Sequence, residues 1–291
     1  MIFEYRGGAW DLAGRARVVG ILNLTPDSFY DGGRYLTREA AVARLEAMAS
    51  EGADAVDVGA QSTRPGGIPI GPEEEWDRLE PLIGPITSTA ARLGIPLSID
   101  TYYAEVARRA LQEGFGIVND VSGLRMDPAL AEVVAGARAG LVLMHSIGAP
   151  DALHVPREYG DVGEEVRAFL EERMRFAESR GIPRERIALD PGIGFSKRAE
   201  QSAEALHGIV QLLSLGRPVY VGVSRKSFLS SLTDAPANDR LAAGLGASLL
   251  AFALGARIFR THDVRETIQA LQVFEHVPRE SVTAGSGDGR S

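Results

Sequence analysis

The sequence predicts a single (β/α)8 barrel, and three observations point to this fold class. Short apolar runs alternate with amphipathic segments eight times along about 275 of the 291 residues. The runs have the length of strands, and the segments between them are long enough for helices. No break in composition marks a second domain. Strands that alternate with helices build a parallel sheet, and eight such units suffice to close a barrel. A doubly wound open sheet is the alternative.

Each predicted strand is a short apolar run bounded by polar residues or glycine. The strands are expected at 17–22, 55–58, 96–99, 116–118, 141–144, 187–189, 218–221 and 257–259. Runs without internal polar alternation are typical of parallel strands that are buried on both faces.

The predicted helices fill the intervals between these strands. They are expected at 37–51, 73–93, 102–112, 128–137, 163–179, 199–214, 239–254 and 264–274. Thr37 is a suitable N-cap for the first, and the glutamates that open the second suit the positive end of its dipole. The barrel is expected to span 1–276, and residues 277–291, rich in Ser, Gly and charge, are expected to form a disordered tail.

Composition narrows the classes of function. The net charge is −8 and no basic stripe is present, so nucleic-acid binding is not expected. The chain has no cysteine, which excludes disulfides, thiolate metal ligands and a cysteine nucleophile. No apolar run is long enough to span a bilayer, and the first residues lack the apolar core of a signal peptide. We therefore expect a soluble cytoplasmic protein. There are two lysines, Lys197 and Lys226, beside 29 arginines.

Polar side chains end nearly every predicted strand, and in a barrel these ends form the active-site rim. Acceptors and amides follow the strands that come third, fourth and sixth, namely Asp100, Asn119 and Asp190, and they suit a flat heterocycle rich in N–H donors. Cations follow the seventh and eighth, and loops there often bind phosphate. Asp57 and Asp120 could equally serve a structural or a functional role. The alternative role for Arg260 and His262 is a salt bridge with Asp263.

Asp190 opens the rigid turn of the segment IALDPGIGFSK. A carboxylate at the end of a buried strand is costly unless donors reach it. It either accepts hydrogen bonds from its own turn or receives a ligand with paired N–H donors, such as an amidine-like ring edge.

Two patterned loops are candidates for covering a substrate: Thr25 to Gly33 and Ser62 to Gly67. Asn23 with Asp27 or Asp31 offers hard oxygen ligands, which suit Mg²⁺ held jointly with a diphosphate.

The motifs NLTPDSFYDGG, STRPGG, SID, VND, LMH, LDPGIGFSK, VGVSRKSF and FRTHD occur in this order between residues 23 and 263. In these motifs the chain resembles the dihydropteroate synthase family of folate biosynthesis. The resemblance implies a transferase that condenses 4-aminobenzoate with 6-hydroxymethyl-7,8-dihydropterin diphosphate, giving 7,8-dihydropteroate and diphosphate. It also implies a homodimer formed through late helices, and the segment Leu241 to Leu254 is apolar enough for that role or for tight packing on the barrel.

The resemblance also implies residue roles. The pterin would be held by Asp100, Asn119, Met144, Asp190 and Lys226. The diphosphate would be held by Asn23, Thr63, Arg260 and His262, with Mg²⁺ at Asn23 and Asp31. The aminobenzoate would be bordered by Phe29, Arg64, Pro65, Phe195 and Ser224. The catalytic set is then Asp190, Lys226, Arg260 and His262.

Four residues depart from the family pattern: Gln61 stands where Glu is usual, Ser196 replaces a glycine, and Ser146 with Ile147 replaces the usual residues after LMH. Two other functions remain open. One is a catalytically silent pterin-binding paralogue. The other is a methyltetrahydrofolate-dependent methyltransferase, which would not need the two patterned loops or the pair Arg260 and His262.

Overall fold

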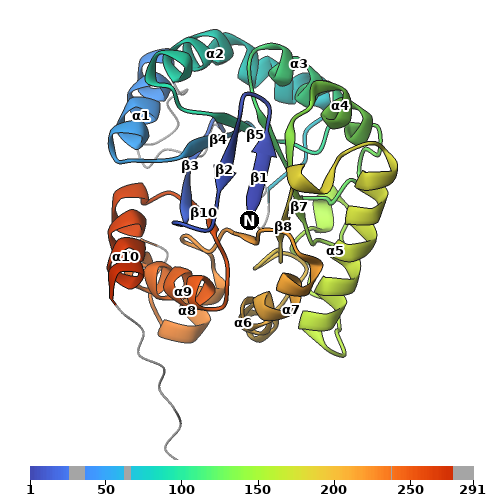
Figure 1. The fold of residues 1–291 in the computed structure, drawn as a ribbon, viewed down its shortest axis with the longest axis vertical. Helices are drawn as coiled ribbons and strands as arrows, with labels where there is room; N and C mark the ends of the chain where they lie inside the picture. Colours follow the sequence, from blue (N-terminus) through green and yellow to red (C-terminus); the bar gives the residue numbers. More distant parts are fainter. Residues whose placement is uncertain (26–36, 62–66, 237, 278–291) are drawn as a thin grey trace, which may run out of the picture.

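The structure is a computed structural model that describes residues 1–25, 37–61, 67–236 and 238–277. In these ranges eight parallel strands form a barrel inside a ring of helices (Figure 1). The strands of the barrel are β3 (Arg17–Asn23), β4 (Ala55–Gly59), β5 (Leu97–Asp100), β6 (Ile117–Asp120), β7 (Gly140–Met144), β8 (Ile187–Asp190), β9 (Tyr220–Val221) and β10 (Ile258–Thr261).

The sheet closes on itself. Its ladders run in the order β8-β7-β6-β5-β4-β3-β10-β9. A parallel bridge between Leu189 and Val219 then joins the two ends of this series, and the Leu189 N–H donates to the Pro218 carbonyl at 2.9 Å. Closure confirms the predicted barrel over the open-sheet alternative.

The helices pack around the barrel and follow the predicted order. They are α1 (Arg38–Ser50), α2 (Pro72–Leu93), α3 (Ala104–Gln112), α4 (Leu130–Ala137), α5 (Val162–Ser179), α6 (Ala199–His207), α7 (Ile209–Leu212), α8 (Phe228–Thr233), α9 (Leu241–Ala253) and α10 (Val264–His276), with short 3-10 turns η1 (Pro150–Ala152), η2 (Arg184–Arg186) and η3 (Leu213–Leu215). Thr37 caps α1 as predicted, because its hydroxyl accepts from the Ala40 N–H at 3.2 Å. No helix in the described part of the chain is both long and apolar enough to cross a membrane.

One predicted helix was wrong in detail, and one short helix was not predicted. The helix expected at 199–214 is divided into α6, α7 and η3. The division falls at Gly208, where an added Cβ would lie 2.8 Å from the Gly163 Cα of α5. The short helix α8, between β9 and α9, was not predicted.

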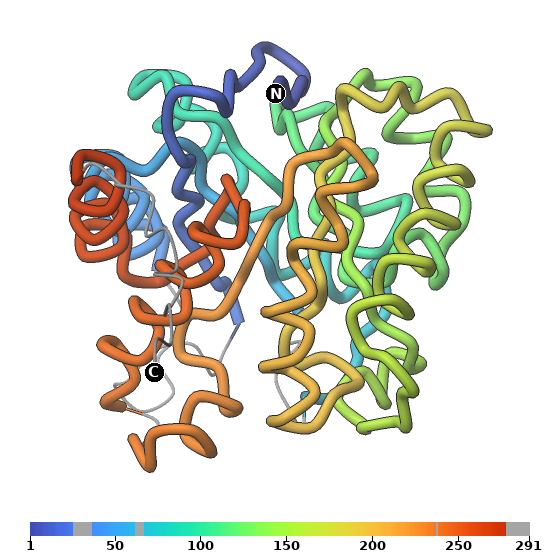
Figure 2. The backbone as a smooth tube through the Cα atoms, turned by 60° about the horizontal axis from the view of Figure 1, so that its bottom comes forward, coloured from blue at the N-terminus to red at the C-terminus, as the bar shows by residue number. Residues whose placement is uncertain are grey.

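An N-terminal hairpin was also missed. It consists of β1 (Ile2–Tyr5) and β2 (Gly8–Asp11), paired antiparallel. Phe3, Trp10 and Leu12 are buried in one cluster with residues from the amino ends of the barrel strands, including Val19 and Ala55. The hairpin therefore covers the amino end of the barrel, and it forms the upper end of the molecule in Figure 2. The opposite end, where the strands finish, carries the polar side chains.

Strand register sets the neighbours on that polar rim. Asp100 lies opposite Asn119 in the β5–β6 ladder, and Met144 lies opposite Asp190 in the β7–β8 ladder. Residues that are far apart in the sequence are thus fixed as neighbours by backbone hydrogen bonds before any ligand binds.

Candidate active site

Arg260 of β10 is clamped between two carboxylates inside the barrel mouth. Its Nε donates to Asp57 Oδ2 at 2.6 Å, and one terminal nitrogen donates to Asp100 Oδ2 at 2.7 Å. The same Asp57 oxygen accepts from the Asn119 amide at 3.0 Å. The other oxygen, Asp57 Oδ1, is buried and has no partner among the described residues. Strands β4, β5, β6 and β10 therefore meet in one hydrogen-bonded cluster.

Burial and charge oppose each other in this cluster. Burial raises the pKa of Asp100 to about 7, although the Arg260 charge acts against the shift. Burial disfavours the charge of Arg260, but Asp57 and Asp100 outweigh this and hold its pKa above the ordinary value. The guanidinium therefore stays charged.

Asp190 lies at the end of β8 and is partly occupied by its own turn. Its Oδ1 accepts from the Gly192 N–H at 2.7 Å, so the first of its two expected roles is confirmed for one oxygen. Burial raises the pKa of Asp190, and the nearby charge of Lys226 opposes this. Gly192 has φ +65°, and a Cβ there would lie 1.9 Å from the His145 carbonyl, so the turn requires glycine.

Lys226 and Phe195 contact each other at the same mouth. The Lys226 ammonium donates to the Ile193 carbonyl and lies 4.6 Å from the centre of the Phe195 ring. Burial lowers the pKa of Lys226 to about 8, and the Asp190 charge opposes the shift. Met144 and Phe195 share a small buried apolar cluster with Tyr102.

His262 and Ser224 form a separate pair near the end of β10. The Ser224 hydroxyl lies 3.1 Å from His262 Nδ1 of the imidazole ring. The same hydroxyl accepts from the backbone N–H of His262 at 3.2 Å. Asp263 is paired with Arg225 at 2.5 Å. The alternative role for Arg260, a salt bridge to Asp263, is therefore wrong, since Arg260 pairs with Asp57 and Asp100 instead.

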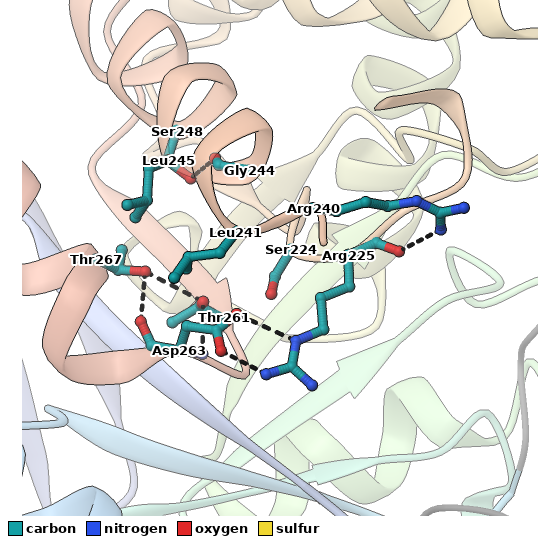
Figure 3. A pocket seen from close by; sticks show the side chains of 10 residues that line it. All are labelled: Ser224, Arg225, Arg240, Leu241, Gly244, Leu245, Ser248, Thr261, Asp263 and Thr267. Atoms are coloured by element: carbon teal, nitrogen blue, oxygen red, sulfur yellow. Dashed lines mark hydrogen bonds and ion pairs between the residues drawn. The ribbon is translucent and has the colours of Figure 1, made fainter. Parts of the chain in front are cut away.

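A small pocket lies beside Ser224 (Figure 3). Arg225, Asp263 and residues of α9 line it together with Ser224. It does not include Asp100, Asn119, Asp190, Lys226 or Arg260. The chemically rich cluster, rather than this pocket, is therefore the candidate site.

Several predicted site residues lie outside the described residues: Phe29, Asp31, Thr63, Arg64 and Pro65, together with Asp27 of the first loop. Asn23 ends β3 beside β4. Among the described residues no group of three His, Asp or Glu side chains could hold a metal ion. The amide oxygen of Asn23 is of the ligand type that Mg²⁺ accepts.

Sequence reasoning underrated two features. The sequence leaves the role of Asp57 open, yet in the structure Asp57 accepts from both Arg260 and Asn119; its position as a charged residue inside an apolar run was the available signal. The buried contact of Lys197 with His145 was missed, although Lys197 is one of two lysines in the chain. Asp120, by contrast, accepts from the Ser122 N–H of its own turn.

Comparison with known proteins agrees with this geometry. The family of pterin binding enzymes matches residues 19–262. Dihydropteroate synthase of Synechocystis sp. is 42% identical, and the match covers 91% of each chain. The structure of Xanthomonas albilineans dihydropteroate synthase with 4-aminobenzoic acid is 42% identical, with a TM-score of 0.86, over 95% of this chain and 99% of that one. The same enzyme in complex with 7,8-dihydropteroate is 40% identical, with a TM-score of 0.83, over 96% and 100% of the two chains. The barrel fold, the polar residues at its carboxyl end and the similarity to known proteins all point to one family. The chain belongs to the dihydropteroate synthases, a family of pterin-binding transferases in folate biosynthesis.

Proposed function

We propose that the barrel mouth joins 4-aminobenzoate to 6-hydroxymethyl-7,8-dihydropterin diphosphate, releasing 7,8-dihydropteroate and diphosphate. One observation carries this proposal. Acceptors for a nitrogen-rich ring and a buried arginine lie in a single hydrogen-bonded cluster, in which Arg260 contacts Asp100 and Asp57 holds Asn119. A ring and its anionic leaving group can thus be bound side by side.

The pterin is assigned to the acceptor side of the mouth. Asp100, Asn119 and Asp190 offer the carboxylate and amide oxygens that a donor edge requires. The second oxygen of Asp190 remains to receive the ring, because the first is held by Gly192. Met144 and Lys226 complete the pterin set, the first as an apolar wall and the second as a cation beside Asp190.

The diphosphate is assigned to Arg260, His262, Asn23 and Thr63. A pterin that binds Asp100 competes with Arg260 for the same carboxylate. This competition frees the terminal N–H groups of the guanidinium to bind an anion, while Asp57 still accepts from Nε. A planar guanidinium binds phosphate oxygens bidentately.

Asn23 and Asp31 would hold Mg²⁺, and the ion would supply further neutralisation of the diphosphate. The support for this assignment is the oxygen chemistry of Asn23 and its place at the end of β3.

The aminobenzoate is assigned to the ring of Phe195, with Ser224, Phe29, Arg64 and Pro65 as neighbours. Phe195 lies under the Lys226 ammonium, so its position is coupled to the pterin side. The Ser224 hydroxyl lies 3.1 Å from His262 Nδ1, and the place of Ser224 beside the aminobenzoate stays a prediction.

The reaction breaks the bond between the pterin methylene carbon and the diphosphate oxygen, and forms a bond from that carbon to the aniline nitrogen. The pterin ring delocalises the positive charge that develops as diphosphate leaves, and Asp190 favours that charge electrostatically. The aniline nitrogen is itself a nucleophile and loses one proton after attack. Leaving-group stabilisation by Arg260 and His262 therefore matters more than a strong base.

Assembly and location also stay proposals. Helix α9 exposes Leu241 and Leu250 at 40% and 47%, which supports a homodimer formed through this late helix. The cytoplasm remains the predicted location. The division into a barrel at 1–276 and a tail at 277–291 likewise stays a prediction, since residues 278–291 lie outside the described part.

Diphosphate release with both substrates and Mg²⁺ tests the reaction. The expected result is release that requires 4-aminobenzoate and is accompanied by dihydropteroate. Pterin binding without diphosphate release would instead support the catalytically silent paralogue. Transfer of a methyl group from methyltetrahydrofolate would support the methyltransferase.

A further inference from the structure

Lys197 is a buried cation that none of the assigned roles uses. It is 5% exposed and follows the turn that begins at Asp190. Its ammonium donates to the carbonyls of Gly192 and Phe195, each at 3.1 Å, and lies 2.8 Å from His145 Nδ1. Three acceptors thus converge on the three protons of one ammonium group.

His145 is built to accept from this lysine. It is fully buried, and burial together with the Lys197 charge lowers its pKa to about 2, so the ring is neutral. A neutral ring that accepts at Nδ1 carries its proton on Nε2. The ring packs edge-on against Phe169 and lies near Tyr159, and the His145 N–H donates to the Asp190 carbonyl at 2.9 Å. The ends of β7 and β8 therefore fix the acceptor in place.

The turn held by Lys197 carries the groups assigned to both substrates. The N–H of Gly192 holds the Asp190 carboxylate, and the carbonyl of Ile193 accepts from Lys226. The ring of Phe195 lies 4.6 Å from that same Lys226 ammonium. Lys197 bonds to the first and last of these turn residues, Gly192 and Phe195. A shift in the turn would therefore move Asp190, Lys226 and Phe195 together.

We propose that Lys197 is a positioning residue whose buried ammonium, received by His145, holds the turn 190–195 in the geometry that binds both the pterin and the aminobenzoate. This inference rests on the proposed function. Lys197 does not touch the reacting atoms, and its effect is transmitted through Gly192 and Phe195.

The cost of burying the ammonium supports a role beyond packing. Burial lowers the pKa of Lys197 to about 7, with the Asp190 charge acting against the shift. An apolar side chain would avoid this penalty. An apolar side chain, however, could not donate hydrogen bonds to the carbonyls of Gly192 and Phe195 and to the imidazole of His145.

Chemical replacement of the ammonium gives a direct test, because the chain contains no cysteine. Lys197→Cys introduces a single thiol, which is alkylated in denaturant before refolding. Treatment with 2-bromoethylamine restores an ammonium at about the length of lysine. Treatment with 1-bromopropane places a methyl group there instead. Wild-type protein carried through the same steps controls for refolding, and Glu113→Cys, at the exposed position directly after α3, controls for alkylation as such.

The propyl form is expected to show KM values for both substrates raised about 10- to 100-fold, as for a misplaced binding group. The aminoethyl form is expected to return to within about threefold of the refolded wild type. Equal KM and kcat values for the two folded forms would overturn the proposal. A wild type that releases no diphosphate would instead reject the proposed function, so the two failures are distinguishable.

His145 provides a second test that needs no refolding. Asparagine places a carbonyl oxygen near the position of Nδ1, whereas leucine offers no acceptor. His145→Asn is expected to keep both KM values within about threefold, and His145→Leu is expected to raise both by about tenfold or more. If Leu and Asn variants both bind the two substrates as wild type does, the proposal fails.

Discussion

At the scale of single residues, the site depends on how a buried arginine is shared. Arg260 forms ion pairs with both Asp57 and Asp100, which limits the penalty of burying these groups. A ligand that takes Asp100 leaves Asp57 as the remaining anchor of the guanidinium. The position of Arg260 during the reaction should therefore depend on Asp57, a residue with no assigned contact to substrate.

Asp57→Ala is expected to lower kcat/KM about 10- to 100-fold, because both Arg260 and Asn119 lose the oxygen that orients them. Asp57→Asn keeps one acceptor oxygen and should lose less. Steady-state kinetics with the pterin diphosphate varied measures this. Activity of the Ala variant equal to wild type would show that Asp100 alone positions Arg260.

The residues of the rim could be predicted from the sequence because a parallel strand delivers its last side chains to a known end of the sheet. The sequence predicts Asp100, Asn119 and Asp190 at one rim, and in the structure Asp100 lies opposite Asn119 while Asp190 ends β8 opposite Met144. The sequence could not pair Arg260 with Asp57. These residues are 203 positions apart, and their contact depends on which side chains point into the barrel. Lys197 and His145 both lie in the motifs quoted above, but the motifs do not show that Lys197 contacts His145, Gly192 and Phe195. These contacts depend on the local backbone geometry of the turn.

At the scale of elements, helix α2 contains an unusual buried acid. Glu75 is fully buried in the first turns of α2 and accepts from the Thr101 hydroxyl at 3.2 Å. Its second oxygen, Oε1, has no partner among the described residues. Burial raises the pKa of Glu75 from 4.5 to about 8. The folded protein therefore binds this proton more tightly than the unfolded chain does.

Stability should fall as pH rises from about 4.5 to about 8, because over this range the unfolded chain releases the Glu75 proton while the folded protein still holds it. Glu75→Gln removes this titration. Its Tm is expected to exceed that of wild type by about 2 °C or more at pH 9, relative to the difference at pH 5. Thermal unfolding at both pH values measures the shift. Glu74→Gln, at an exposed neighbouring position, should show no such dependence; an equal shift in both variants would point to general surface charge.

Regular elements were the more predictable part of the fold. The eight strands follow from apolar runs, since burial on both faces imposes that composition. The hairpin β1–β2 was missed because its buried residues, Phe3 and Trp10, pack only against residues at the amino end of the barrel, which are distant in the sequence. Helix α8 was missed because six residues carry too little helical periodicity to recognise. The break at Gly208 depends on the close approach of α5, which the sequence does not display.

At the scale of the whole molecule, the barrel separates two ends with different tasks. The hairpin fills the amino end with aromatic side chains, and charged groups collect at the carboxyl end. There the strands bring the ring acceptor Asp100 within hydrogen-bonding distance of Arg260, a cation assigned to the leaving group. The central claim is that these two sets act on different parts of one substrate.

Calorimetric binding of two ligands to three proteins tests this claim most directly. The ligands are 6-hydroxymethyl-7,8-dihydropterin and its diphosphate, the latter with Mg²⁺, and the proteins are wild type, Asp190→Asn and Arg260→Ala. Asp190→Asn should weaken both ligands by a similar factor of about 10 or more, because an acceptor becomes a mixed donor and acceptor. Arg260→Ala should weaken the diphosphate about tenfold more than the alcohol. Unchanged affinity in Asp190→Asn, or equal losses for both ligands in Arg260→Ala, would contradict the account.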